Sequence, residues 1–218
     1  TCEGKAGMRN IAVIGAGHMG TGIAQTVAGY GMSVMLADID LAHAEGGKTR
    51  IDKAVTKLVG RGKMEAAEAE TLLGRITPVA DYAPMVDADL IIEAATEKEP
   101  IKQAIFESAG KVLGSDAVMA SNTSSIPITR MANHSPDPLR FIGLHFFNPV
   151  PVMGLIEVIP GLATAQNTTD RVTAFAEGLG KQVVLSQDEP GFVVNRILLP
   201  MIHEAVFVLG QSTAGIED

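Results

Sequence analysis

The feature that most constrains the fold of this chain is a glycine-rich turn between a short apolar run and a helical pattern. Residues 9–14 are typical of a buried strand, residues 15–20 read GAGHMG, and residues 18–30 place apolar side chains at helical spacing. A second strand is predicted at residues 33–37. A strand, a tight glycine turn, a helix and a second strand form one βαβ unit, which predicts a parallel sheet covered by helices.

The same alternation continues along most of the chain. Further strands are predicted at residues 75–79, 89–93, 117–120, 139–145, 152–159 and 182–185, and helices at residues 41–60, 66–73, 100–113, 170–179 and 192–209. This pattern is typical of an α/β, Rossmann-type, doubly wound and mostly parallel sheet. The last helix, broken or kinked at Pro200, is expected to begin an all-helical second domain. We expect a first domain at residues 1–187 and the truncated beginning of a second at residues 188–218.

Composition excludes several classes of protein. The formal net charge of −8 argues against nucleic-acid binding. The chain contains no run of 18 apolar residues, so no transmembrane helix is predicted. Residues 1–7 lack the apolar core of a signal peptide. The single cysteine, Cys2, excludes an internal disulfide or a cysteine-based metal site, which suits a cytoplasmic protein.

The glycine turn predicts a dinucleotide site. In a GxGxxG turn, Gly15 permits the tight turn, Gly17 lets a pyrophosphate approach the backbone, and Gly20 lets the helix pack closely. The helix N-terminus, at His18 and Met19, offers free N–H groups and a partial positive charge to the phosphates. The surrounding strand–turn–helix–strand unit makes the motif more specific than a lone glycine-rich turn.

Asp38 stands at the end of the second predicted strand, 18 residues after Gly20. A carboxylate at this place can accept hydrogen bonds from the ribose hydroxyls of an adenosine and would repel a 2′-phosphate. It therefore favours NAD over NADP. The alternative is that Asp38 caps the following helix.

A histidine and a glutamate lie on two apolar runs that flank a proline-rich turn. If the runs pair as antiparallel strands, His145 and Glu157 are symmetric about Pro151 and face each other. A carboxylate that holds a histidine fixes its tautomer for proton transfer. The alternatives are a satisfied core histidine and a glutamate on a solvated face.

Five segments of the chain resemble the 3-hydroxyacyl-CoA dehydrogenase family, and the resemblance runs from about Met8 to the end. They are residues 14–20 (IGAGHMG), 91–97 (IIEAATE), 121–125 (SNTSS), 145–149 (HFFNP) and 190–196 (PGFVVNR). The first segment occurs in many dehydrogenases, whereas the last three together are specific. The resemblance implies NAD-dependent, reversible oxidation of an L-3-hydroxyacyl-CoA, such as 3-hydroxybutyryl-CoA, to a 3-oxoacyl-CoA.

The resemblance also implies roles for individual residues. His145 is then the general base and Glu157 its partner, with no need for a metal. Ser124 and Asn195 would contact the reacting oxygen of the substrate. The residues implied to border the cofactor are Asn122, on the nicotinamide side, Glu97 and Lys102. Asn122 and Ser124 could alternatively only shape a turn, and Asn195 could lie on a helix surface.

An acyl-CoA is anionic, and basic residues gather in one helical stretch whose only acid is Asp52. They are Lys48, Arg50, Lys53, Lys57, Arg61 and Lys63. Lys53, Lys57 and Arg61 are four residues apart and are predicted to share a helix face. A solvated face and a surface that contacts the phosphates of CoA remain equal alternatives, and for the second we single out Lys57 and Arg61.

Two other functions compete with this interpretation. A dehydrogenase of another 3-hydroxy acid would usually place a lysine as the acid/base group, and no lysine here stands in a comparable motif. A non-catalytic NAD-binding protein, similar to the lens crystallins that resemble this family, would not need the four intact residues His145, Glu157, Ser124 and Asn195. In the family a helical second domain closes the cleft and forms the dimer, so we expect a homodimer when that domain is complete.

Overall fold

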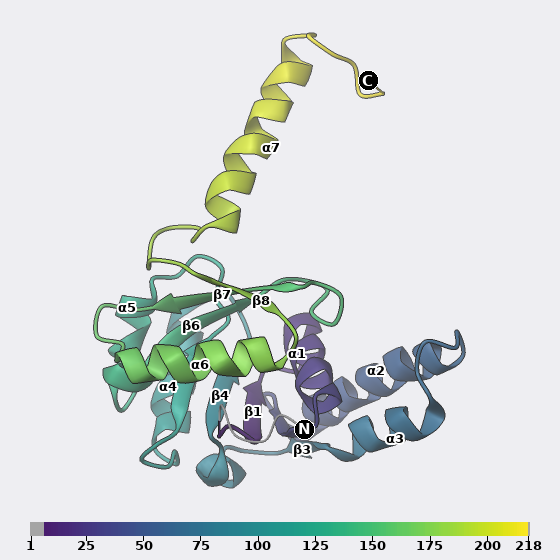
Figure 1. Ribbon diagram of the computed structural model, residues 1–218. Helices are drawn as coiled ribbons and strands as arrows, with labels where there is room; N and C mark the ends of the chain where they lie inside the picture. The colour runs from purple at the N-terminus through teal and green to yellow at the C-terminus, as the bar shows by residue number, and fades with distance from the viewer. Residues whose placement is uncertain (1–6, 218) are drawn as a thin grey trace.

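The computed structural model describes residues 7–217 and shows an eight-stranded sheet with helices on both faces (Figure 1). The strands are β1 (Asn10–Ile14), β2 (Ser33–Ala37), β3 (Ile76–Val79), β4 (Leu90–Glu93), β5 (Val118–Ser121), β6 (Phe141–Phe146), β7 (Leu155–Pro160) and β8 (Gln182–Leu185). Their order across the sheet is β3-β2-β1-β4-β5-β6-β7-β8, and every neighbouring pair is parallel except β6 with β7. The expected Rossmann-type fold is confirmed, and Cys2 lies outside the described residues.

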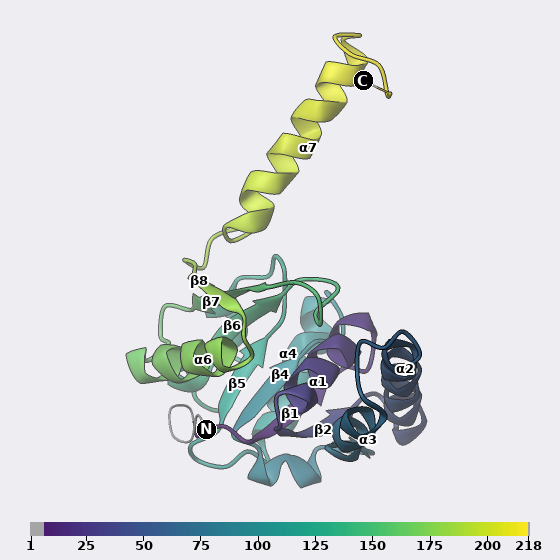
Figure 2. The same ribbon diagram turned by 45° about the vertical axis from the view of Figure 1, so that its right-hand side comes forward.

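The helices before α7 divide between the two faces of the sheet (Figure 2). They are α1 (His18–Gly29), α2 (Leu41–Val59), α3 (Ala66–Gly74), α4 (Glu99–Gly110), α5 (Ile128–Ala132), α6 (Gln166–Gly178) and α7 (Val194–Gly210), with short 3-10 helices η1 (Ala83–Asp87) and η2 (Pro138–Arg140). Helices α1, α2, α3 and α6 pack on one face, and α4, α5 and η1 pack on the other.

Strand β1 shows how the sequence builds both layers. Its residues Ile11 and Val13 belong to the core beneath α1, whereas Ala12 and Ile14 belong to the core on the opposite face. Successive side chains of a strand point to opposite faces, so a central strand covered on both sides must be apolar throughout. This explains why the run before the glycine turn has no polar alternation.

Some elements differ from the predicted ones. The sequence patterns did not predict α5, η1 or η2, because elements of three to five residues are too short to show helical periodicity. Helix α6 begins at Gln166, four residues before the predicted start. Its first turn is polar, yet Thr168 is buried there and its hydroxyl donates to the carbonyl of Leu139 at 2.9 Å.

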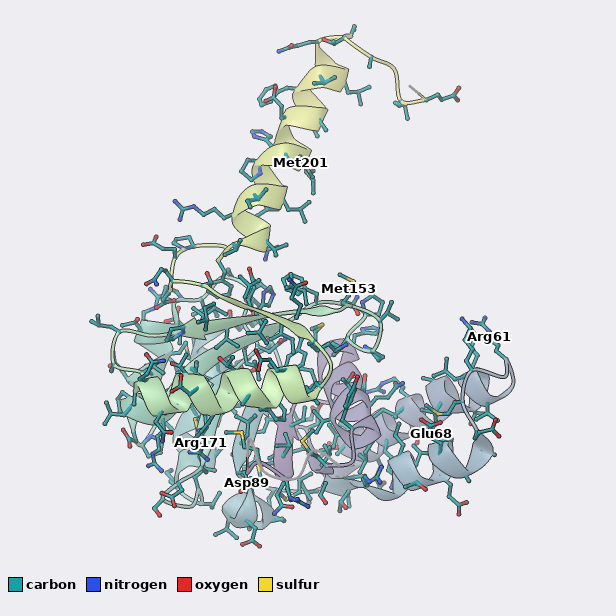
Figure 3. All side chains as sticks on the ribbon, in the orientation of Figure 1. Arg61, Glu68, Asp89, Met153, Arg171 and Met201 are labelled. Atoms are coloured by element: carbon teal, nitrogen blue, oxygen red, sulfur yellow. The ribbon has the colours of Figure 1, made fainter. Side chains whose placement is uncertain are left out.

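Helix α7 projects away from the sheet, as Figure 1 and the position of Met201 in Figure 3 show. None of its 17 residues is buried. The helix continues through Pro200, so it is not broken there, and the alternative of a kink stays a prediction. Because the helix is solvated, water can bind the carbonyl that proline leaves without an N–H partner. No helix within residues 7–217 has the length and apolar character needed to cross a membrane.

Candidate active site

The turn that joins β1 to α1 depends on two of its glycines. Gly15 adopts a φ of +105°, and a Cβ there would lie 2.5 Å from the Cα of Ala95. A Cβ on Gly20 would lie 1.6 Å from the carbonyl oxygen of Gly15. Glycine is therefore required at both places for α1 to begin this close to β1.

Gly17 in the same turn borders open space. A Cβ built on Gly17 meets no atom within 4 Å. Gly17 is the N-cap of α1, and no side chain within residues 7–217 caps the free N–H groups of the first turn. His18 is exposed there, and Met19 is half-buried. The space and the free donors fit the pyrophosphate of a dinucleotide.

Asp38 follows β2 and binds the glycine turn itself. Its Oδ2 accepts the N–H of Ala16 at 2.6 Å. The alternative role of Asp38 as a helix cap is wrong, because Asp40 caps α2 by accepting the N–H of His43 at 2.8 Å. That backbone hydrogen bond, with a second one to the His43 ring, lowers the pKa of Asp40. The Asp38 carboxylate is thus held against the turn, where an adenosine ribose is expected.

A pocket of about 240 Å³ opens beside the turn, at the carboxyl ends of β4 and β5. Its lining includes five residues that the sequence had singled out, namely Met19, Glu97, Lys102, Asn122 and Ser124. In open α/β sheets, ligands bind at this edge, where the strand order reverses. The structure therefore brings four of the predicted cofactor residues together with Ser124.

Lys102 forms an ion pair with Glu93 at the edge of the pocket. The Lys102 Nζ lies 2.6 Å from Glu93 Oε2, and the two side chains are 2% and 0% exposed. Glu93 also accepts the N–H of Ala95 and the hydroxyl of Ser121. These partners compensate for the burial of both charges. The sequence patterns predicted no role for Glu93, although a carboxylate at the end of an apolar strand was the available signal.

Glu97 organises the turn of residues 121–125. Its Oε1 accepts the hydroxyl of Thr123 at 2.6 Å and the N–H of Ser124 at 2.8 Å. Its Oε2 lies 3.7 Å from the Nζ of Lys102. The Ser124 hydroxyl has no hydrogen-bond partner within residues 7–217, so it is free for a ligand. Glu97 therefore orients the turn as well as lining the pocket.

Asn122 links the pocket to the strand that carries His145. Its Oδ1 accepts the N–H of Phe146 at 2.8 Å, and its side chain lines the pocket. Only 8% of the residue is exposed. With the oxygen engaged, the NH₂ group is the part of Asn122 left to meet a ligand.

His145 and Glu157 are paired as the sequence predicted. They are direct neighbours in the antiparallel register of β6 and β7, and His145 Nδ1 lies 2.7 Å from Glu157 Oε2. Glu157 is fully buried, so it is not on a solvated face. Because a carboxylate only accepts, Nδ1 is the donor in this pair, and in the neutral imidazole Nε2 then presents a lone pair. Within residues 7–217, Nε2 has no hydrogen-bond partner, which favours proton transfer over a purely structural role.

The second oxygen of Glu157 binds the start of α7. Its Oε1 accepts the N–H groups of Val193 at 3.0 Å and Val194 at 2.9 Å. The partial positive charge of a helix N-terminus stabilises a carboxylate there. Asn195 is the next residue, so α7 places it within one turn of the pair. Its side chain makes no hydrogen bond within the described part of the chain.

Lys181 braces the turn between β6 and β7. Its ammonium donates to the carbonyls of Val150 at 2.9 Å and Met153 at 2.7 Å, and Figure 3 labels Met153 in this turn. Partial burial lowers the pKa of Lys181. By fixing this turn, Lys181 helps to hold the strand register that pairs His145 with Glu157.

Lys57 and Arg61 lie away from the pocket. Both are exposed, and Figure 3 shows Arg61 at the tip of the α2–α3 hairpin. The predicted common face is partly wrong, because α2 ends at Val59 and Arg61 lies in the following turn. Their contact with a substrate phosphate stays a prediction.

The chain is similar to known dehydrogenases in sequence and in structure. Residues 10–189 match the family model described as 3-hydroxyacyl-CoA dehydrogenase, NAD binding domain. A protein of Deinococcus radiodurans named probable 3-hydroxybutyryl-CoA dehydrogenase is 47% identical over 93% of this chain and 72% of its own length. The 3-hydroxybutyryl-CoA dehydrogenase of Bradyrhizobium diazoefficiens is 44% identical over 96% and 72%. The crystal structure of (S)-3-hydroxybutyryl-CoA dehydrogenase from Ralstonia eutropha has a TM-score of 0.93 and 42% identity, over 96% of this chain and 74% of that one.

Proposed function

Because the chain belongs to the 3-hydroxyacyl-CoA dehydrogenase family, we propose that it oxidises an L-3-hydroxyacyl-CoA reversibly to a 3-oxoacyl-CoA with NAD. The relatives named above act on 3-hydroxybutyryl-CoA, so a short acyl chain is the proposed substrate. Such an oxidation is a step of fatty-acid β-oxidation. The observation that carries the proposal is the buried His145–Glu157 pair, whose strand is hydrogen-bonded through the N–H of Phe146 to Asn122, a residue that lines the pocket.

The residues of this chain supply proton transfer and orientation. Bound NAD supplies the acceptor for the hydride that leaves C3 of the substrate. The Nε2 of His145 takes the proton of the C3 hydroxyl, and Glu157 holds the imidazole and stabilises its cationic form. The hydroxyl of Ser124 and the amide of Asn195 are proposed to bind the substrate oxygens as charge shifts between them. In the reverse direction, His145 returns the proton to the carbonyl oxygen.

The dinucleotide would lie along the edge formed by the turn and the pocket. Gly15, Gly17 and Gly20 shape the pyrophosphate cradle, with His18 and Met19 at the first turn of α1. We propose that Asp38 binds the adenosine ribose, and that Glu97, Lys102 and Asn122 border the nicotinamide half. Lys57 and Arg61 remain the proposed contacts for the CoA phosphates.

The domain division is also part of the proposal. Residues 1–187 would form the NAD-binding domain, and residues 188–218 would begin a helical domain for substrate and dimer contacts. Strand β8 ends at Leu185, and the solvated apolar helix α7 follows, which supports a boundary between them. A homodimer in the cytoplasm is the proposed form.

The function is tested by NADH oxidation with 3-oxoacyl-CoA substrates. We expect turnover of acetoacetyl-CoA, measured by loss of NADH absorbance, with lower kcat/KM for longer acyl chains. Binding of NADH without turnover of any 3-oxoacyl-CoA would instead indicate the non-catalytic alternative. Equal kcat/KM for acetoacetyl-CoA and free acetoacetate would indicate a dehydrogenase of another 3-hydroxy acid.

Replacing Asp38 with asparagine should weaken the preference for NAD. Asparagine keeps an oxygen acceptor for the N–H of Ala16 but removes the charge that repels a 2′-phosphate. We expect the ratio of NADPH to NADH affinity to rise about tenfold, which corresponds to about 1.4 kcal/mol. Fluorescence titrations of both cofactors measure this ratio. The matched control is Asp40→Asn, which changes a neighbouring carboxylate that caps α2 and pairs with the His43 ring. An unchanged ratio in Asp38→Asn would remove Asp38 from the ribose.

A further inference from the structure

Phe192 lies between β8 and α7 and reaches the imidazole of His145. Its ring centroid is 5.7 Å from that of His145, at an interplanar angle of 61°. Phe147 contacts the same imidazole, with a centroid distance of 4.6 Å. Phe192 is only 3% exposed, although α7, which begins two residues later, has no buried residue. The chain is therefore anchored to the sheet at the point where it touches the proposed base.

The backbone of Phe192 adopts a conformation that side chains usually avoid. Its φ is +51°, and the preceding Gly191 has a φ of +78°. Such values are uncommon for residues other than glycine, asparagine and aspartate. The Phe192 N–H donates to the carbonyl of Glu189 at 2.9 Å, and the N–H of Arg196 donates to that of Gly191 at 3.1 Å. A bulky aromatic residue at such a place indicates that its ring contact outweighs its backbone preference.

This left-handed pair aims the next two N–H groups at Glu157. Val193 and Val194 follow directly, and both donate to Glu157 Oε1. The other oxygen of Glu157 holds His145 Nδ1. One short segment therefore acts on the His145–Glu157 pair twice, through the Phe192 ring on the imidazole and through the following backbone on the carboxylate.

We propose that Phe192 is a positioning residue for proton transfer, which keeps the His145 ring and the Glu157 carboxylate aligned so that Nε2 faces the substrate. This inference rests on the proposed function of His145 as the base. Phe192 would act on the geometry of proton transfer at the transition state, so cofactor binding and substrate affinity should not depend on its ring.

The test compares Phe192→Leu and Phe192→Gly with the unchanged chain. Leucine keeps an apolar side chain but removes the ring, whereas glycine removes the ring and accepts a left-handed backbone. Phe175→Leu is the matched control, because Phe175 is 2% exposed in α6 and packs on the core beneath that helix. Four quantities are measured: kcat and KM with acetoacetyl-CoA, the Kd of NADH, and the ¹H NMR resonance of the proton between His145 Nδ1 and Glu157. The resonance is assigned by its loss in His145→Gln.

Both Phe192 variants should lower kcat by about tenfold to 100-fold, the effect of a misplaced reacting group. The KM and the NADH Kd should stay within about twofold, because neither depends on the base geometry. The Nδ1 resonance should shift or broaden in both variants and stay unchanged in Phe175→Leu. Normal kcat in Phe192→Gly, an unchanged resonance, or a loss no greater than that of Phe175→Leu would overturn the inference. The resonance needs no substrate, so it still tests Phe192 if the unchanged chain fails to turn over acetoacetyl-CoA and the proposed function is wrong.

Discussion

The His145→Gln variant should turn over acetoacetyl-CoA at least about 100-fold more slowly than the unchanged chain, the usual contribution of a positioned base. Glutamine can still hydrogen-bond Glu157, but it has no ring nitrogen to accept the hydroxyl proton. NADH binding should be unaffected, because His145 does not line the cofactor pocket. Steady-state kinetics gives the loss in kcat, and a fluorescence titration gives the NADH Kd.

The control for this variant is His134→Gln. His134 also pairs with a carboxylate, at 2.9 Å from Glu107, but it lies on the surface between α5 and η2. Its replacement should leave kcat unchanged. Near-normal turnover in His145→Gln would show that another group moves the proton, whereas equal losses in both variants would point to a general effect on the fold.

Replacing Gly20 with alanine should abolish NADH binding. The new Cβ would lie 1.6 Å from the carbonyl oxygen of Gly15, and backbone stands on both sides of the contact. The turn must therefore open, which separates α1 from β1 and removes the cradle for the pyrophosphate. Overpacking of this kind costs about 3 kcal/mol. Thermal unfolding should give a lower midpoint, and a fluorescence titration should detect no NADH binding.

Gly17→Ala is the matched comparison in the same turn. A Cβ on Gly17 meets nothing within 4 Å, so the thermal midpoint should not fall. NADH should nevertheless bind more weakly, because the methyl group occupies space that the pyrophosphate needs. If Gly20→Ala bound NADH normally, α1 would not need its close approach to β1. If Gly17→Ala bound NADH normally, the phosphates would lie elsewhere.

The sequence predicted those parts of the molecule that depend on local pattern. Strands β2 and β8 have the predicted bounds, because apolar runs with clear ends mark them. The pairing of His145 with Glu157 was predictable because antiparallel register follows from the position of the turn. The glycine turn was predictable because each glycine answers a steric need of the backbone.

Other parts of the site depend on tertiary contacts that no local pattern reveals. Glu93 and Lys102 are nine residues apart, and only the packing of α4 against the sheet brings their charges together. The N–H of Ala16, which follows β1, donates to the carboxylate of Asp38, which follows β2. Backbone donors of this kind are the same for every residue type except proline, so no sequence pattern marks them.

The sheet and the hydrogen bonds of Glu157 end at different places in the chain. The sheet is complete at Leu185, where β8 ends. The last hydrogen-bond donor to Glu157, the carboxylate proposed to orient the base, is the N–H of Val194, which lies beyond the predicted domain boundary. A shorter piece ending at that boundary would keep every strand and the glycine turn, yet leave Glu157 Oε1 without its two donors. Nucleotide binding by such a piece would therefore be a poor measure of whether Glu157 still orients His145.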